Sequence, residues 1–209
     1  MESASSYNII KKEGLSEIVV TKSRFIGILV GVSDAAEAES VIAQVKKKYH
    51  DARHNCWAYV ILDESGCISR SSDDGEPSGT AGRPILSVLE GAGLVNVLCI
   101  VTRYFGGVLL GTGGLVRAYT DAAKAALDDA EISELRPGVV IRLSFDYADE
   151  ASIRRYAESS GFAITGSDYG EKVSFELTGP RENADGFISR ITDMSGGKVH
   201  PEKGEDIYY

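Results

Sequence analysis

"RYFGGVLLGTGGLVRAY", residues 103–119, joins an apolar stretch typical of a strand to an alanine-rich stretch typical of a helix. Glycine occupies positions 106, 107, 111, 113 and 114 within it. Glycine lets the backbone approach a ligand closely, and a helix N-terminus offers unbonded N–H groups, so such a turn can hold an anion. The sequence therefore predicts a docking loop for an anion or a backbone between a strand and a helix.

Neither common nucleotide-binding loop fits this spacing. A P-loop places Gly-Lys-Ser/Thr after four residues, whereas the four residues after Gly106 lead to Gly-Thr-Gly at 111–113, with no lysine to reach the outer phosphates. The dinucleotide fingerprint requires glycine or alanine where Val116 stands. Hydrolysis of a nucleotide at this loop is therefore not expected.

Outward from the loop, hydrophobic periodicity predicts a domain of mixed strands and helices. Asp34 and Glu37 have capping-box spacing ahead of apolar residues at helical intervals. A continuous β-branched run predicts a buried strand directly before the loop. The predicted elements are strands at 17–32, 56–62, 67–71 and 95–102, helices at 34–49, 84–90 and 115–130, a hairpin turn at 63–66 and a loop at 72–82.

A second pattern begins after residues 134–138, Glu-Leu-Arg-Pro-Gly, because a Pro-Gly pair breaks regular structure. The remaining chain predicts the ferredoxin-like order βαββαβ. We therefore expect an α+β protein of two domains, an N-terminal two-layer α/β domain over 1–135 and a C-terminal ferredoxin-like domain over 139–209. The C-terminal elements are expected at 139–146, 150–159, 162–168, 172–178, 181–194 and near 198–207.

The overall composition is that of a folded, acidic protein, with 209 residues, 43% of them hydrophobic, and a formal net charge of −9. No apolar stretch reaches the roughly 20 residues of a membrane span, and the first residues lack the pattern of a signal peptide, so we expect a cytoplasmic protein without membrane contact. Cys56, Cys67 and Cys99 lack CxxC spacing and are expected to be reduced thiols. In so acidic a chain, nucleic-acid binding requires a local basic patch.

Three acids lie in the segment "SSDDGEPSGTAGRP" that follows the predicted hairpin. Asp73, Asp74 and Glu76 offer oxygen ligands suited to a hard cation, although their spacing falls short of an EF-hand. They equally suit hydrogen bonds to backbone N–H groups in a turn enforced by glycine and proline. A third interpretation pairs them with Arg83 or Arg103 across a cleft. The residues alone leave these three interpretations open.

Histidines and basic residues give weaker signals. His50 and His54 stand four apart, as zinc ligands on a helix do, but Asp51 takes the place of the catalytic glutamate of that motif. His54 is more simply a cleft residue or a structural hydrogen-bonding residue. The Arg-Tyr-Phe triplet at 103–105 suits stacking on bases or on a peptide. The lysines at 46–48 suit either a solvated helix end or the rim of an anion patch.

Three segments, in order, resemble the YigZ/IMPACT family: "ARHNCWAY" at 52–59, "SDDGEPSGTAGRPIL" at 72–86 and "TRYFGGVLLGTGGLVRAY" at 102–119. The resemblance spans the whole chain. It implies an N-terminal domain similar to the fourth domain of elongation factor G and to a domain of a small-subunit ribosomal protein, and a C-terminal domain similar to that factor's fifth domain. It also implies a role in translation, since eukaryotic members regulate translation by binding a large ribosome-associated protein and bacterial members are associated with nucleic-acid binding.

The functional surface that the resemblance implies gathers residues from all three segments. Leu109 departs from the pattern, since some members carry a basic residue there. With leucine at this position, the loop of this chain is less cationic. We expect a translation-associated regulatory or binding protein that docks RNA, the ribosome or a ribosome-associated protein, with no catalytic residue, cofactor or metal. The alternative is an enzyme that acts on a phosphorylated or nucleotide ligand with a metal at the acidic loop. The implied residues are Arg53, His54, Asp73, Asp74, Glu76, Arg83, Arg103, Tyr104, Gly106, Gly107, Gly111 and Arg117.

Overall fold

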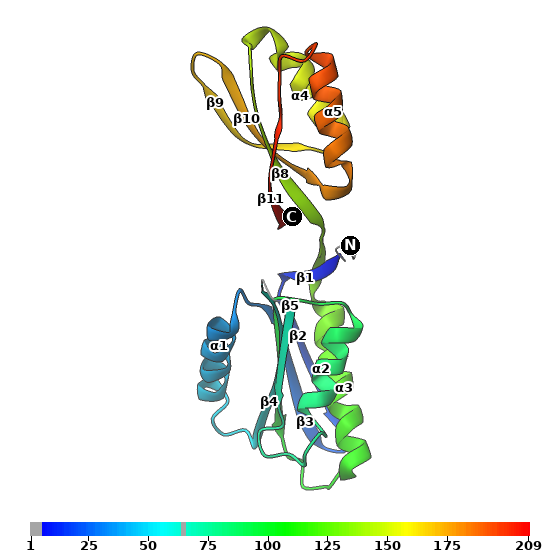
Figure 1. Cartoon of the computed structure of the whole chain (residues 1–209). Helices are drawn as coiled ribbons and strands as arrows, with labels where there is room; N and C mark the ends of the chain where they lie inside the picture. The colour runs from blue at the N-terminus through cyan, green and yellow to red at the C-terminus, as the bar shows by residue number, and fades with distance from the viewer. Residues whose placement is uncertain (1–5, 64–65) are drawn as a thin grey trace. The chain divides into compact units, whose positions relative to one another are not determined.

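The computed structural model describes residues 6–63 and 66–209, with two compact units at Tyr7–Glu134 and Leu135–Tyr209. Strands and helices are mixed in both units (Figure 1), which confirms the expected α+β class with two domains. Within the described ranges, no helix is long and apolar enough to cross a membrane.

The first unit is built on a five-stranded antiparallel sheet in the order β2-β3-β6-β4-β5. Helix α1 covers one face of this sheet, and helices α2 and α3 cover the other (Figure 1). Because both faces are covered, β3 is almost wholly buried, and the unit has three layers where the sequence predicted two. Its elements are β2 Gly14–Val20, β3 Ser23–Gly31, α1 Ala35–Lys48, β4 His54–Asp63, β5 Gly66–Ser72, α2 Gly82–Gly91, β6 Val97–Tyr104 and α3 Gly111–Asp129.

Two local predictions in this unit were wrong. The stretch 17–32 is not one strand, since β2 and β3 pair through a turn at Thr21 and Lys22, whose φ angles are +46° and +67°. Such left-handed angles suit a two-residue hairpin, but neither residue is the glycine or asparagine that usually signals one. Helix α3 begins at Gly111 rather than at the predicted Leu115, so the last glycines of the loop lie in its first turn.

Two pairings lie at the margins of the unit. β1, Tyr7–Lys12, pairs with β7, Glu131–Leu135, in a separate two-stranded sheet that the sequence did not predict. The two strands are far apart in the chain, so no local turn signal announces their pairing. The predicted hairpin of β4 and β5 is confirmed and extends to Asp63 opposite Gly66, while residues 64 and 65 of its turn lie outside the described residues.

Small residues let α3 lie directly on the sheet. A Cβ atom at Gly27 of β3 would overlap the Ala122 carbonyl of α3, so the two backbones approach closely at this point. This packing brings Tyr119 of α3 edge-on to Phe25 of β3, with ring centroids 5.2 Å apart at an interplanar angle of 88°. The position of Tyr119 is therefore fixed by the packing of α3 against the sheet.

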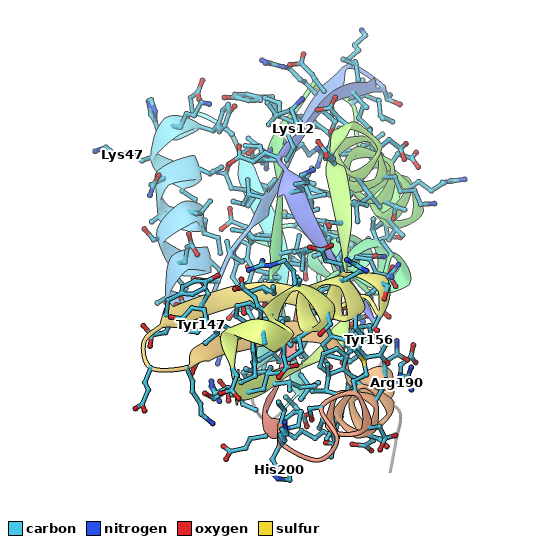
Figure 2. The ribbon with its side chains drawn as sticks, turned by 90° about the horizontal axis from the view of Figure 1, so that it is seen from above. Lys12, Lys47, Tyr147, Tyr156, Arg190 and His200 are labelled. Carbon is cyan, nitrogen blue, oxygen red and sulfur yellow. The ribbon has the colours of Figure 1, made fainter. Side chains whose placement is uncertain are left out.

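The second unit has the order βαββαβ and an antiparallel sheet in the order β11-β8-β10-β9, which confirms the ferredoxin-like prediction. Pro137 and Gly138 begin β8 instead of breaking the chain, since proline is tolerated at the first residue of a strand. Its core contains Phe145, Phe162 and Phe187, and Tyr156, which is labelled in Figure 2, packs against this core. Its elements are β8 Pro137–Phe145, α4 Glu150–Ser159, β9 Ala163–Tyr169, β10 Val173–Pro180, α5 Ala184–Met194 and β11 Glu202–Tyr208.

Candidate functional site

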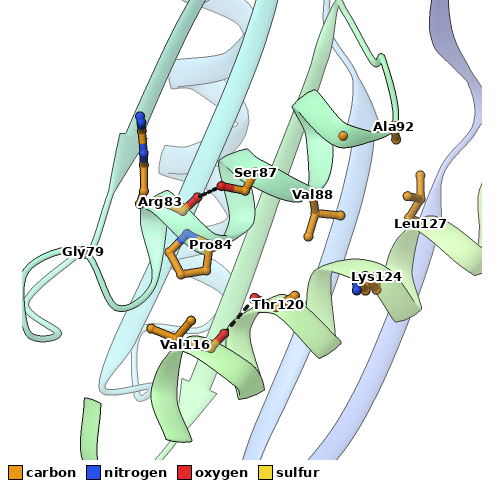
Figure 3. Close-up of a pocket in the computed structure, with 11 residues that line it drawn as sticks. Gly79, Arg83, Pro84, Ser87, Val88, Ala92, Val116, Thr120, Lys124 and Leu127 are labelled. Atoms are coloured by element: carbon orange, nitrogen blue, oxygen red, sulfur yellow. Dashed lines mark hydrogen bonds between the residues drawn. The ribbon is translucent and has the colours of Figure 1, made fainter. Parts of the chain in front are cut away.

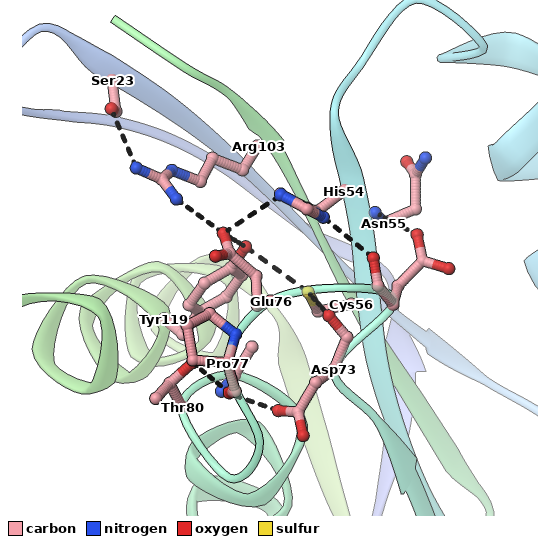
Figure 4. Close-up of polar contacts among 12 residues, drawn as sticks. Ser23, His54, Asn55, Cys56, Asp73, Glu76, Pro77, Thr80, Arg103 and Tyr119 are labelled. Carbon is pink, nitrogen blue, oxygen red and sulfur yellow. Dashed lines mark hydrogen bonds and ion pairs between the residues drawn. The ribbon is translucent and has the colours of Figure 1, made fainter. Parts of the chain in front are cut away.

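A buried carboxylate lies where the three sequence segments meet (Figure 4). Glu76 Oε1 accepts a hydrogen bond from Arg103 Nη1 at 2.6 Å and another from the Tyr119 hydroxyl at 2.8 Å. The Glu76 side chain is only 4% exposed, and charge-assisted hydrogen bonds are strongest where water is excluded. One oxygen atom therefore ties the acidic loop to β6 and α3.

His54, the first residue of β4, stands beside this carboxylate. Its Nδ1 lies 2.8 Å from the backbone carbonyl of Asp74, and its Nε2 lies 3.9 Å from Glu76 Oε1. A carbonyl oxygen only accepts, so Nδ1 carries a proton and donates it. Nε2 is therefore the ring atom of His54 that faces the Glu76 carboxylate.

Arg103 is a buried cation rather than a surface one, because only 5% of the residue is exposed. Besides Glu76, its guanidinium reaches Ser23 Oγ through Nη2 at 3.4 Å. The guanidinium carbon also lies 5.4 Å from the Phe25 ring centroid and 5.6 Å from that of Phe105. Arg103 Nε has no hydrogen-bond partner among the described residues. The charge of Arg103 is therefore neutralised inside the domain.

Cys56 and Tyr119 complete the network without supplying a nucleophile. The Cys56 thiol lies 3.4 Å from the Tyr119 hydroxyl and 2.9 Å from the Asp73 carbonyl, to which it donates. Burial raises the pKa of the Cys56 thiol to about 12. Burial, with the neighbouring Cys56 and Glu76, also raises the pKa of Tyr119. Both groups therefore stay protonated and act as hydrogen-bond donors at neutral pH.

The Asp73 carboxylate holds the start of α2. It accepts backbone N–H groups from Gly79 at 2.8 Å and from Ala81 and Gly82 at 2.9 Å each. Burial raises the pKa of Asp73, but these three hydrogen bonds outweigh it, so the net direction is downward. Asp73 therefore satisfies the N–H groups of the N-cap residue Ala81 and of Gly82, the first residue of α2, and Ala81 has no polar side chain with which to cap the helix itself.

Asp74 ties the acidic loop to two other elements. One carboxylate oxygen accepts the backbone N–H of Asn55 at 2.7 Å, and the other pairs with Lys46 Nζ at 2.6 Å. Lys46 lies in the last turn of α1, so the predicted basic rim reaches the loop through this residue. Asp73 accepts hydrogen bonds from backbone N–H groups, as expected if the acids stabilise a turn. Glu76 pairs with Arg103, as expected if the acids pair with an arginine.

The metal interpretation of the acidic loop is not supported by these contacts. Every one of its three carboxylates is already engaged by donors of the protein, and they point to different elements. No cluster of three or more histidine, cysteine or acidic residues that suits a metal is found in the described part of the chain. His50 follows the end of α1 while His54 begins β4, so the two histidines do not share a helix.

The glycine-rich loop is shaped by close backbone contact. A Cβ atom at Gly106 would overlap the backbone of Lys22 and Ser23, so only glycine fits there. Gly107 and Gly111 have φ angles of +85° and +69°, which favour glycine. Helix α3 then begins without a side-chain cap and without an acid in its first turn. Its first N–H groups are therefore presented at the end of the loop.

Two exposed arginines flank the loop. The Arg53 guanidinium lies 5.4 Å from the ring centroid of Phe105, which is itself 38% exposed. Arg117 Nε donates to the Gly113 carbonyl at 3.3 Å. Within the described ranges, neither arginine has an acidic side chain at ion-pair distance. Leu109, at 87% exposed, is the most exposed large apolar residue of the loop.

The residues implied by sequence thus fall into two groups. His54, Asp73, Asp74, Glu76 and Arg103 form the inward network, while Arg53, Arg117 and the glycines face the loop surface. Arg83 is exposed on α2 and belongs to neither group. Tyr104 is half-buried, donates its hydroxyl to Asp51 at 2.8 Å and lies under Arg24. Sequence reasoning missed Ser23, Cys56 and Tyr119. Cys56 lies within the segment at 52–59, and Tyr119 is the last residue of the segment at 102–119.

Residues 21–127 match the Impact N-terminal domain, and residues 143–198 match a domain of unknown function, DUF1949. The chain belongs to the IMPACT family. It is 39% identical to the IMPACT family member YvyE of Bacillus subtilis over 97% of this chain and 93% of that protein. It is 35% identical to the IMPACT family member YigZ of Escherichia coli over 86% of this chain and 89% of that protein.

Two further similarities place the family resemblance in context. Protein IMPACT of Rattus norvegicus is 35% identical over 43% of this chain and 29% of its own length, so only part of that protein is shared. A crystal structure titled as that of a hypothetical protein matches with a TM-score of 0.62 and 31% identity, over 95% of this chain and 97% of that one. The resemblance read from the three segments is therefore confirmed. The likeness to domains of elongation factor G stays a prediction.

Proposed function

We propose that this IMPACT family protein is a translation-associated binding protein that docks on RNA or the ribosome through the loop surface, defined as Arg53, Phe105, residues 106–114 and Arg117. The observation that carries the proposal is the exposed stack of Arg53 on Phe105 at the base of the glycine-rich loop. An exposed aromatic ring backed by a guanidinium suits stacking with an unpaired base.

The rest of the loop surface supports contact with a phosphate backbone. The N-terminus of α3 has no side-chain cap and no acid in its first turn, so its dipole favours a negative group nearby. Arg53 and Arg117 supply two cations at the two ends of the loop. Family membership and the role in translation that the resemblance implies support RNA of the ribosome as the ligand class.

The number of cations on this surface sets the expected salt dependence. Arg103 is buried against Glu76 and Arg83 lies outside the loop surface, so two arginines remain. Each neutralised phosphate contributes roughly 0.7 to 0.9 to the slope of log affinity against log salt, so we expect a slope of about −2. A much steeper slope would require cations that this surface does not contain.

The experiment is co-sedimentation with ribosomes, together with binding to single- and double-stranded RNA, at several salt concentrations. Arg53→Ala and Arg117→Ala should each weaken binding several-fold and flatten the slope by roughly 0.7 to 0.9. Arg155→Ala, at an exposed arginine of α4, should change neither. No binding to ribosomes or RNA at low salt would refute direct docking. Ribosome binding that resists salt while free RNA stays unbound would instead assign the surface to a ribosome-associated protein.

A further inference from the structure

A groove of about 690 Å³ runs between α2 and α3 of the first unit (Figure 3). Its walls carry one stripe from each helix. On α3 the stripe runs from Val116 through Thr120 and Lys124 to Leu127, at helical spacing over about 16 Å. On α2 it includes Pro84 and Val88 and ends at Gly91.

The polar side chains of the walls are already satisfied by their own helices. Ser87 Oγ donates to the Arg83 carbonyl at 3.1 Å, and Thr120 Oγ1 donates to the Val116 carbonyl at 2.8 Å (Figure 3). The hydroxyl groups of Ser87 and Thr120 therefore offer no free donor, and these two side chains present their carbon atoms to the groove. The floor is in effect apolar, which favours an occupant with an apolar face.

The charges on the groove contrast with the charge of the chain. The protein as a whole has a formal net charge of −9, yet the described residues that line the groove include Arg83 and Lys124 and no acid. Within the described ranges, neither cation has an acidic side chain at ion-pair distance. The groove is therefore complementary to a negatively charged partner.

We propose that this groove docks an acidic amphipathic helix of a protein partner. Both walls are helices whose interior backbone groups bond internally, so an extended peptide would gain no backbone hydrogen bonds here, whereas a helix satisfies its own. No aromatic ring lines the groove in the described residues, so bases have nothing on which to stack. The occupant buries its apolar stripe against Val88, Val116 and Leu127, and its acids face Arg83 and Lys124.

The test is a displayed library of helical peptides of about 12 residues, or three turns, with fixed apolar positions at i, i+4 and i+7 and with acidic, basic and neutral residues randomised at the flanks. Selection against the full natural chain should enrich acidic flanks. Enrichment of basic flanks, or no enrichment, overturns the proposal. The best selected peptide is then measured by fluorescence anisotropy.

Variants of the full chain locate that binding. Gly91 lines the groove, and a Cβ atom there meets no other atom within 4 Å, so Gly91→Leu should add bulk to the groove without a Cβ clash and weaken peptide binding at least tenfold. Gly186→Leu is the matched control, because Gly186 is also helical and equally open, and it should have no effect. The double change Arg83→Glu with Lys124→Glu should shift the preference towards basic flanks. Peptide binding that survives Gly91→Leu contradicts the groove assignment.

This inference goes beyond the proposed function and fails separately from it. Arg53→Ala and Arg117→Ala alter the loop surface and should leave peptide affinity unchanged. RNA binding that is lost in the double variant of Arg83 and Lys124 but retained in Arg53→Ala would assign the groove to RNA and overturn the helix proposal.

Discussion

At the scale of single residues, Glu76 connects the fold to the candidate site. Its carboxylate is 4% exposed and meets the guanidinium of Arg103, which is 6% exposed at the side chain. Two buried charges are costly to desolvate, and such a pair persists only when its geometry and hydrogen bonds are good. Tyr119 supplies the additional hydrogen bond here. The network therefore holds β6, α3 and the acidic loop in fixed positions relative to one another.

Removing the negative charge of this pair should destabilise the first domain. Glu76→Gln leaves the Arg103 charge buried without its counter-charge, so we expect a loss of about 2–4 kcal/mol in the free energy of unfolding. Chemical denaturation at neutral pH measures it, with Glu158→Gln as an exposed control. The double variant Glu76→Gln with Arg103→Met should lose less free energy of unfolding than the two single variants lose together, because the two residues interact. Additive losses would argue against the pair.

Asp73 predicts a pH dependence of stability. Its folded-state pKa lies below its unfolded value, so its contribution is complete above the unfolded value of about 3.9 and is lost as the pH falls through the folded value. Asp73→Asn keeps one acceptor oxygen but turns an amide donor towards the Gly79 N–H. We therefore expect it to lower the free energy of unfolding by about 1–2 kcal/mol at pH 7.

The difference in the free energy of unfolding between the natural chain and Asp73→Asn should then stay constant from pH 5 to about 4 and shrink between about 4 and 3, because protonation of Asp73 removes the charge that strengthens its hydrogen bonds. Urea denaturation across this range measures it. Asp193→Asn, at an exposed carboxylate of α5, controls for the loss of one charge. A difference that stays constant down to pH 3 would show that Asp73 does not act through its ionised form.

At the scale of elements, the glycine-rich loop depends on particular glycines rather than on glycine content. Gly106→Ala would drive a Cβ atom into the backbone of Lys22 and Ser23, and rigid backbone cannot move aside, so we expect a loss of about 2–4 kcal/mol. Gly113→Ala lies in the first turn of α3 with open space around it and should stabilise by about 0.5–1 kcal/mol. Thermal unfolding distinguishes the two, and equal effects would contradict this account.

Local signals predicted most of these elements, and non-local ones were missed. The capping box was readable because Asp34 accepts the Glu37 N–H at 2.8 Å within one helical turn. The turn at Thr21 and Lys22 was missed because its left-handed angles come from strand pairing and not from turn-type residues. The acidic and cationic residues of the site were identifiable, but their burial was not, because the Glu76–Arg103 contact depends on how three distant segments pack.

At the scale of the whole molecule, each unit has its own hydrophobic core. One core cluster contains residues from Val139 to Val199, and another contains residues from Ile26 to Ile100. A chain of roughly 70 residues can fold alone when its core is complete, although small domains are marginal.

We therefore expect chains covering residues 1–135 and 136–209 to fold separately. Each should melt cooperatively, and each should keep the circular dichroism of its share of the natural chain. The first retains β1 together with β7, and the second retains all four strands of its sheet. A broad, non-cooperative loss of structure in either would show that the two units depend on each other for stability.

The order of strands in the larger sheet also determines when it can form during synthesis. β6 lies between β3 and β4, yet it is the last of the five strands to leave the ribosome. Until then β2–β3 and β4–β5 are separate hairpins whose inner edges lack a neighbour, and elongation at about 5–20 residues per second prolongs that state. Insertion of β6 places Arg103 opposite both Phe25 and His54 and closes the gap. The nascent chain just short of β6 is therefore the form most exposed to aggregation.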